Sequence, residues 1–167
     1  MRLLHDLFIV NSMTAIQIPN LLDDPLFLGL QINPIVIRLL ELLRKHISPI
    51  EQALCLAAIV YLGDIRVLFC SYHTTGYHFV TKIRAMMQAI QWTDFHDLRL
   101  WTLVVTGIKS ADTDREFFIG ETREAMRALG LVNWSQATEV VESLLWIKSI
   151  YGDMCADFGS LVMARPF

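Results

Sequence analysis

Two adjacent acidic residues near the N-terminus, Asp23 and Asp24, form the first group in the chain that could bind a metal ion. Magnesium takes several oxygen ligands, so a site that holds it against a diphosphate would need further carboxylates at helical spacing. The sequence offers none there, and Pro25 follows the pair directly. We therefore interpret the pair as part of a solvated turn.

A second group, made of Cys70, His73 and His78, could supply three ligands to zinc. Structural zinc sites normally use four protein ligands, and no fourth ligand lies nearby. His96 and Asp97 are a further pair of reactive side chains, but adjacent residues project from different faces of a helix. They are therefore a poor arrangement for a catalytic hydrogen bond.

Motifs that support common enzyme classes are also missing. The chain has no glycine-rich phosphate loop and no Gly-x-Ser-x-Gly elbow, which removes the usual warrant for nucleotide or serine hydrolysis. We assign no catalytic, cofactor-binding or metal-binding residue, and we expect no cofactor. The four tryptophans, Trp92, Trp101, Trp134 and Trp146, could line a ligand cavity between helices, but core packing is the favoured interpretation.

The three cysteines are Cys55, Cys70 and Cys155, an odd number at wide spacings and without a Cys-x-x-Cys pair. This pattern encodes neither a zinc cluster nor a disulfide framework. We expect reduced thiols within a core.

The clearest pattern in the chain predicts three consecutive helices between Leu98 and Trp146. Asp94 is the expected cap of the first, and Asp112 the expected cap of the second, which should end at Leu129-Gly130. The third has a capping-box spacing and an apolar stripe. Its residues are Asn133 and Gln136 for the box, and Ala137, Val140, Val141, Leu144 and Leu145 for the stripe.

Other helices are predicted on both sides of this block. Pro34 suits the first turn of a helix that continues to His46. Ser48-Pro49-Ile50-Glu51 is a capping box that should open a long, buried helix reaching Phe69. Further helices are expected over residues 77–90 and from Trp146 to Val162, the latter weakened by Gly152 and Gly159.

Strand signals are absent, so the predicted fold class is all-α, with about six or seven helices in a single irregular domain. A length of 167 residues favours one domain. Residues 1–33 form a partly irregular N-terminal segment, because prolines, glycine and turn-forming residues are frequent from residue 11 to residue 33. Residues 34–167 form the helical domain.

The central block resembles the fungal-specific transcription factor domain, the regulatory domain of fungal zinc-cluster transcription factors. In that family a leucine- and tryptophan-bearing helix ends in a valine-glycine turn, an arginine-aromatic pair starts the next helix, and a leucine-glycine-leucine stop precedes a polar cap and tryptophan. The matching segments here are Leu100-Trp101 to Val105-Thr106-Gly107, Arg115-Glu116-Phe117-Phe118, Leu129-Gly130-Leu131, Asn133-Trp134 and the closing Leu145-Trp146. The helix over residues 51–62 resembles an earlier family helix. Lys109 departs from the small residue usual at its position, and the zinc cluster itself is missing.

Composition sets limits on partners. Hydrophobic residues make up 54% and charged residues 19%, which exceeds the hydrophobic share of ordinary soluble domains and predicts a partner surface. The net charge of −3 gives no electrostatic basis for binding nucleic acid. No apolar stretch reaches the roughly 18 residues of a membrane span.

The resemblance implies a regulatory role in the nucleus. The chain would act through protein partners, or through the upstream part of a larger regulator, with effector sensing as a further expectation and no DNA binding of its own. Formation of a homo-oligomer is compatible with this role. Two alternatives stay open: a small helical enzyme or ligand-binding protein, and a truncated regulator fragment without independent function.

Overall fold

The structure is a computed structural model that describes residue 26, residues 28–69 and residues 77–164. Within these ranges the chain is helical and contains no strand, which confirms the predicted all-α class. The elements are η2, a π-helix (Leu28–Ile32), and the α-helices α3 (Asn33–Leu42), α4 (Pro49–Phe69), α5 (Tyr77–Ala89), α6 (His96–Gly107), α7 (Asp112–Ala128), α8 (Trp134–Leu144) and α9 (Lys148–Met163).

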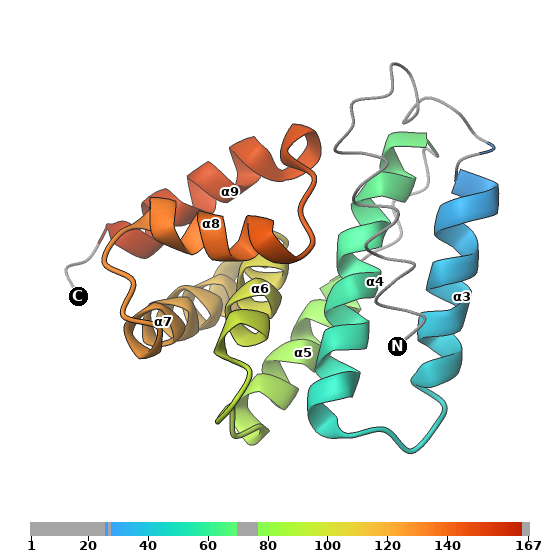
Figure 1. The fold of residues 1–167 in the computed structure, drawn as a ribbon, viewed down its shortest axis with the longest axis horizontal. Helices are drawn as coiled ribbons and strands as arrows, with labels where there is room; N and C mark the ends of the chain where they lie inside the picture. The colour runs from blue at the N-terminus through green and yellow to red at the C-terminus, as the bar shows by residue number, and fades with distance from the viewer. Residues whose placement is uncertain (1–25, 27, 70–76, 165–167) are drawn as a thin grey trace.

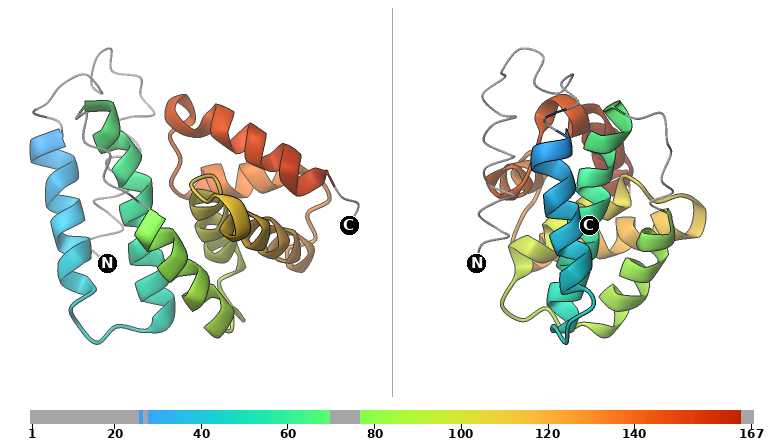
Figure 2. Two further views of the ribbon diagram at one scale, coloured as in Figure 1. Left: turned by 180° about the vertical axis from the view of Figure 1, so that it is seen from behind. Right: turned by 90° about the vertical axis from the view of Figure 1, so that its right-hand side faces the viewer.

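The helices form two parts that meet along α4 and α6. Helix α3 lies antiparallel to α4 on one side of the molecule, whereas α6, α7, α8 and α9 pack together on the other (Figure 1). Helix α5 connects them by packing against both α4 and α7, as the views from behind and from the side also show (Figure 2). Helix α4 is therefore covered on several sides, and most of its side chains from Ala53 to Ile65 are buried.

The capping box that opens α4 is confirmed atom by atom. The Ser48 backbone N–H donates to Glu51 Oε2 at 2.8 Å, and the Glu51 backbone N–H donates to Ser48 Oγ at 3.3 Å. Both bonds satisfy N–H groups that have no partner within the helix. The Glu51 carboxylate also accepts the Ser48 hydroxyl at 2.8 Å. The two bonds that Glu51 Oε2 accepts, from the Ser48 backbone N–H and from the Ser48 hydroxyl, favour the charged carboxylate and hold the pKa of Glu51 below its ordinary value.

The predicted signals around α7 and α8 are partly confirmed. Gly130 has φ +68°, and the Leu131 N–H donates to the Met126 carbonyl, so glycine supplies the left-handed residue that ends α7. The Gln136 N–H donates to Asn133 Oδ1 at 3.0 Å, as expected for the cap of α8. The Gln136 side chain bonds the Val132 N–H instead of the N–H of Asn133, so the box is shifted by one residue.

Two predicted caps are wrong. Helix α6 starts at His96 with Phe95 at the cap position, and Asp94 Oδ2 instead accepts the Thr93 hydroxyl. Helix α7 has Ala111 at its cap position, with no side-chain cap. Asp112 has φ +48°, which is left-handed, whereas a capping residue needs an extended backbone to direct its side chain at the following N–H groups.

The start of α3 also differs from the prediction. Residues 28–32, expected to be irregular, form the π-helix η2, which leads directly into α3. Pro34 has no N–H to donate to the carbonyl of Leu30, and a wider turn before proline accommodates its ring. Helix α3 ends at Leu42, before the predicted limit at His46.

Candidate functional site

The side chains that could do chemistry do not assemble into a site within the described residues. Asp23, Asp24, Cys70 and His73 lie outside these residues. His96 and Asp97 are the first two residues of α6, and Asp97 is exposed. Among the described residues, no group of three or more His, Cys, Asp or Glu side chains could hold a metal ion.

Cys55 and Cys155 are free thiols in the core, as predicted. Burial raises the pKa of the Cys55 thiol, with a further contribution from the charge of Glu51. Burial likewise raises the pKa of Cys155 to about 11. Because the thiolate is the nucleophile, both residues are poorly suited to covalent chemistry at neutral pH.

The four tryptophans pack in or against the hydrophobic core. Trp92, Trp101 and Trp146 are at most 7% exposed, and Trp101 Nε1 donates to the Leu145 carbonyl at 2.7 Å. Trp134 is half-buried and packs edge-on against Phe158, with ring centroids 6.1 Å apart. No tryptophan lines either of the two surface hollows described below.

A partly buried polar contact joins α4, the residues just after α6, and α9. Asp64 Oδ1 lies 2.8 Å from Lys109 Nζ, and Lys109 also reaches Met154 Sδ at 3.3 Å. Tyr151 donates its hydroxyl proton to the Tyr61 carbonyl, so Asp64 Oδ2 is left without a hydrogen bond. Burial raises the pKa of Asp64, and the Lys109 ammonium offsets part of that effect.

The contact gives Lys109 a structural role in this fold. Its ammonium neutralises a carboxylate that the long helix α4 carries into the interior. No local sequence pattern predicts the contact, because Asp64 lies on α4 and Lys109 lies far along the chain, just after α6. A second contact of this kind joins α5 and α7, where Asp114 accepts from Arg84 at 2.5 Å and from Thr81 at 3.2 Å.

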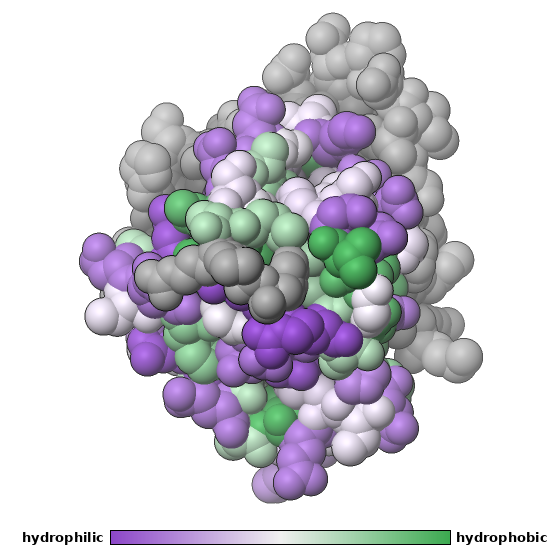
Figure 3. Space-filling model, turned by 90° about the vertical axis from the view of Figure 1, so that its left-hand side faces the viewer, coloured by the Kyte–Doolittle hydropathy of each residue, from purple (hydrophilic) through white to green (hydrophobic). Residues whose placement is uncertain are grey.

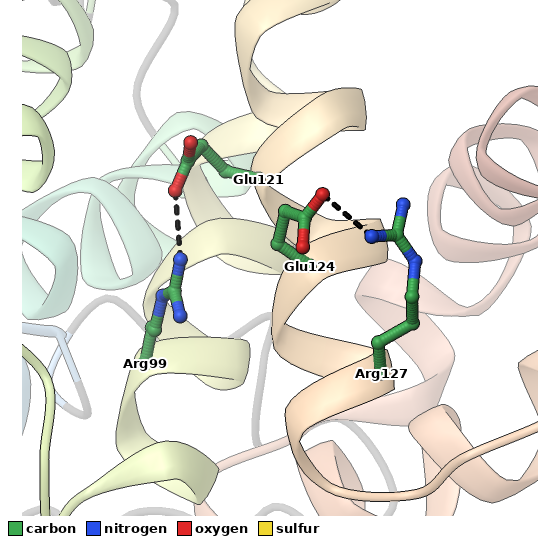
Figure 4. Close-up of polar contacts among 4 residues, drawn as sticks. All are labelled: Arg99, Glu121, Glu124 and Arg127. Carbon is green, nitrogen blue, oxygen red and sulfur yellow. Dashed lines mark hydrogen bonds and ion pairs between the residues drawn. The ribbon is translucent and has the colours of Figure 1, made fainter. Parts of the chain in front are cut away.

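Two ion pairs, one partly buried and one exposed, are found on α6 and α7. Arg99 of α6 lies 2.8 Å from Glu121 of α7, and Arg127 lies 2.7 Å from Glu124 within α7 (Figure 4). The Arg99 and Glu121 side chains are partly buried, whereas Arg127 and Glu124 are exposed. An exposed pair such as Arg127–Glu124 contributes little to stability, typically below about 1 kcal/mol.

The most unusual surface of the described residues lies on the outer side of η2 and α3. We define the η2–α3 surface by Leu30, Ile37 and Leu40, whose side chains are 68%, 56% and 42% exposed; nearby Leu26 is 67% exposed. Helix α3 buries a different set, Ile35, Val36 and Leu39, against its neighbours. It is therefore apolar on two sides, although α4 covers only one of them (Figure 1).

The side of the molecule away from α3 has a different character. There hydrophilic residues interrupt the hydrophobic areas, as the space-filling view shows (Figure 3). Val132, before α8, and Leu161, on α9, are the large apolar side chains exposed in this C-terminal part. Single exposed residues of this kind are normal on soluble proteins.

Comparison of the chain with family models, with curated proteins and with solved structures finds no match. The resemblance to the fungal regulatory domain therefore stays a prediction from sequence pattern. Within the described residues, no helix has both the length and the hydropathy that crossing a bilayer requires.

Proposed function

We propose that this chain is a regulatory helical domain of the kind found in fungal zinc-cluster transcription factors. It acts in the nucleus through protein contacts and does not bind DNA itself. The observation that carries the proposal is the η2–α3 surface, where large aliphatic side chains face solvent beside the apolar core of the described residues. Exposed apolar patches mark interaction sites or aggregation liabilities.

The helix order supports the same proposal. The segments that resemble the family fall on α4, α6, α7 and α8, and its turn motifs fall on the ends of these helices. The acidic net charge of −3 supports action through protein and not through nucleic acid. The resemblance also implies effector sensing, for which we name no residue.

The proposed protein contact through the η2–α3 surface can be tested with charged substitutions on that surface. We expect the unmodified chain to self-associate, or to bind a hydrophobic dye, in static light scattering and fluorescence titrations. The double variant Ile37→Lys, Leu40→Lys should be monodisperse and bind the dye weakly, because each lysine adds charge where the partner surface must be apolar.

A matched control places two lysines on the opposite side, at Val132 and Leu161, which are similarly exposed. This control should behave like the unmodified chain. If the unmodified chain is a clean monomer with weak dye binding, the protein-contact proposal is wrong, and a self-sufficient enzyme or carrier is favoured.

DNA binding is tested separately by gel-shift titration at physiological salt. We expect no sequence-selective binding, because specific recognition relies on basic contacts to phosphate that this acidic chain does not concentrate. Selective binding with a dissociation constant below about 1 μM would contradict the proposal.

A further inference from the structure

Phe95 stands between two hollows on the molecular surface. One has a volume of about 370 Å³ and is lined by Leu98, Leu129 and Leu144 together with residues 94–97. The other, of about 360 Å³, is lined by Ser48, Ile50, Glu51, Leu54 and Leu98. Phe95 and Leu98 line both hollows, so the two adjoin, and we call them together the Phe95 groove. Each hollow falls within the size range of small ligand sites, which begins at about 300 Å³.

The position of Phe95 is unfavourable for folding. It occupies the cap position of α6, where Ser, Thr, Asp or Asn would bond the free N–H groups, and it makes no side-chain cap. Its ring is also 50% exposed. A residue that breaks two local rules without visible gain to the fold is a candidate for a functional role.

The groove combines an apolar floor with an acidic rim. Its carboxylates are Glu51, Asp94 and Asp97, and no lysine or arginine is among the described residues that line it. Helices α4 and α6 both begin at this end of the molecule (Figure 1), and each helix start contributes roughly +0.5 of an elementary charge. Three carboxylates outweigh two helix ends, so the rim is negative.

Charge complementarity indicates which kind of partner the Phe95 groove can bind. A negative rim repels acidic partners and attracts lysine and arginine, while the apolar floor requires aliphatic or aromatic side chains. Amphipathic helices dock in apolar grooves by inserting residues from one face, with the charged residues at the edges. We propose that the Phe95 groove binds a basic amphipathic helix of a partner protein, with the Phe95 ring as the central anchor.

This surface is distinct from the η2–α3 surface, so either proposal can fail alone. The probe is a fluorescently labelled synthetic peptide of leucine, lysine and alanine, about 18 residues long, with leucines at helical spacing. Two companion peptides replace lysine by glutamate or scramble the leucine spacing. Fluorescence anisotropy should show that the first peptide binds at least about tenfold more tightly than either companion.

The decisive variant is Phe95→Ser. Serine is a preferred helix cap, so thermal unfolding should show a variant at least as stable as the unmodified protein, while peptide affinity should fall about tenfold. If Phe95 were needed only for structure, Phe95→Ser would instead lower the stability of the protein.

The double variant Asp94→Asn, Asp97→Asn should lower the affinity for the peptide and weaken the salt dependence of that affinity. Its control, Glu139→Gln with Asp153→Asn, makes the same charge change on exposed positions of α8 and α9 and should bind normally.

Several outcomes would overturn the inference. Equal binding of the scrambled peptide would show nonspecific attraction to an acidic protein, and preferential binding of the glutamate peptide would reverse the assignment of charge. Unchanged affinity in Phe95→Ser would place the peptide elsewhere. A dimer in light scattering that Phe95→Ser dissociates would assign the groove to a second copy of this chain.

Discussion

Helices α3 and α8 are nearly equal in length, with 10 and 11 residues, but they use their apolar residues differently. Helix α8 buries Ala137 and Val141 and presents polar residues such as Glu139 to solvent. Helix α3 buries one apolar stripe and exposes Ile37 and Leu40 on another. One buried stripe is sufficient to dock a helix of this length, so the second stripe of α3 is available for another purpose.

The same contrast appears in what surrounds each helix. An aromatic group joins α4 to the C-terminal part. In it the Tyr151 ring stacks on the ring of Tyr61 of α4 with centroids 4.8 Å apart, and lies 5.2 Å from the Trp146 ring. Among the described residues, α3 packs chiefly against α4 and η2. The comparison therefore predicts large stability losses in the C-terminal part and small losses on the outer side of α3.

The largest loss is expected for Leu145→Ala. Leu145 is 7% exposed, and its carbonyl receives the Trp101 indole N–H, so truncation leaves a cavity beside the aromatic group. The free energy of unfolding should fall by about 2–5 kcal/mol. Urea midpoints would measure it. Glu139→Ala, on the exposed side of α8, should change the value by no more than about 0.5 kcal/mol, and equal losses would mean that the core face is misplaced.

Gly159→Ala should come next, with a loss of about 1–3 kcal/mol. A methyl group at Gly159 would overlap the Trp134 indole, which packs directly on the glycine backbone. Gly120→Ala is the matched control, because nothing lies within 4 Å of the added carbon and the residue is in mid-helix. It should stabilise the protein by about 0.5–1 kcal/mol in the same thermal or urea experiment. A gain from both substitutions would show that α9 does not pack closely on Trp134.

These two glycines show what the sequence could and could not predict. Short-range signals worked: the Ser48–Glu51 box, the Asn133 cap and the Gly130 stop depend on residues within a few positions of one another. Gly159 was predicted to weaken the last helix, whereas it permits close approach of a tryptophan 25 positions earlier. The Asp64–Lys109 pair was missed for the same reason, since tertiary contacts leave no local spacing.

The failures at helix starts have a different origin. Asp94 and Asp112 are both suitable capping residues, and each lies within two positions of a real helix start. Neither residue caps its helix. The backbone of Asp112 is in the left-handed conformation, and Phe95, not Asp94, occupies the cap position of α6. The Phe95 groove was not predicted for that reason: Phe95 occupies a position that local rules assign to a polar side chain.

A third prediction concerns pH and the contact between Asp64 of α4 and Lys109. The pKa of Asp64 is raised in the folded state above its ordinary value of about 3.9, so the folded protein binds this proton more tightly than the unfolded chain. The contribution of Asp64 to stability is therefore most favourable at low pH and is lost as pH rises through the raised pKa.

Asp64→Asn should remove this dependence, because an amide does not titrate. Urea midpoints measured from about pH 4 upward should show the unmodified protein losing stability relative to the variant until Asp64 is fully ionised. Asp153→Asn, an exposed change on α9, should follow the unmodified protein. A relative gain in stability with rising pH would show that Lys109 outweighs burial and lowers the Asp64 pKa.

The smallest effect is expected on the outer side of α3, and it separates a surface kept for binding from one needed for folding. Ile37→Lys and Leu40→Lys should each change the free energy of unfolding by no more than about 0.5 kcal/mol, because both side chains are already largely in water and lysine is a good helix former. Leu39→Ala, in the same helix but 1% exposed, should cost about 2–5 kcal/mol. The free energies of unfolding of the three variants should be measured in urea at low protein concentration, so that self-association does not affect the comparison. If the lysine variants lose as much stability as Leu39→Ala, the outer stripe is packed within the folded monomer, and the contrast between α3 and α8 fails. If they are stable and monodisperse, the stripe contributes to association without contributing to the fold.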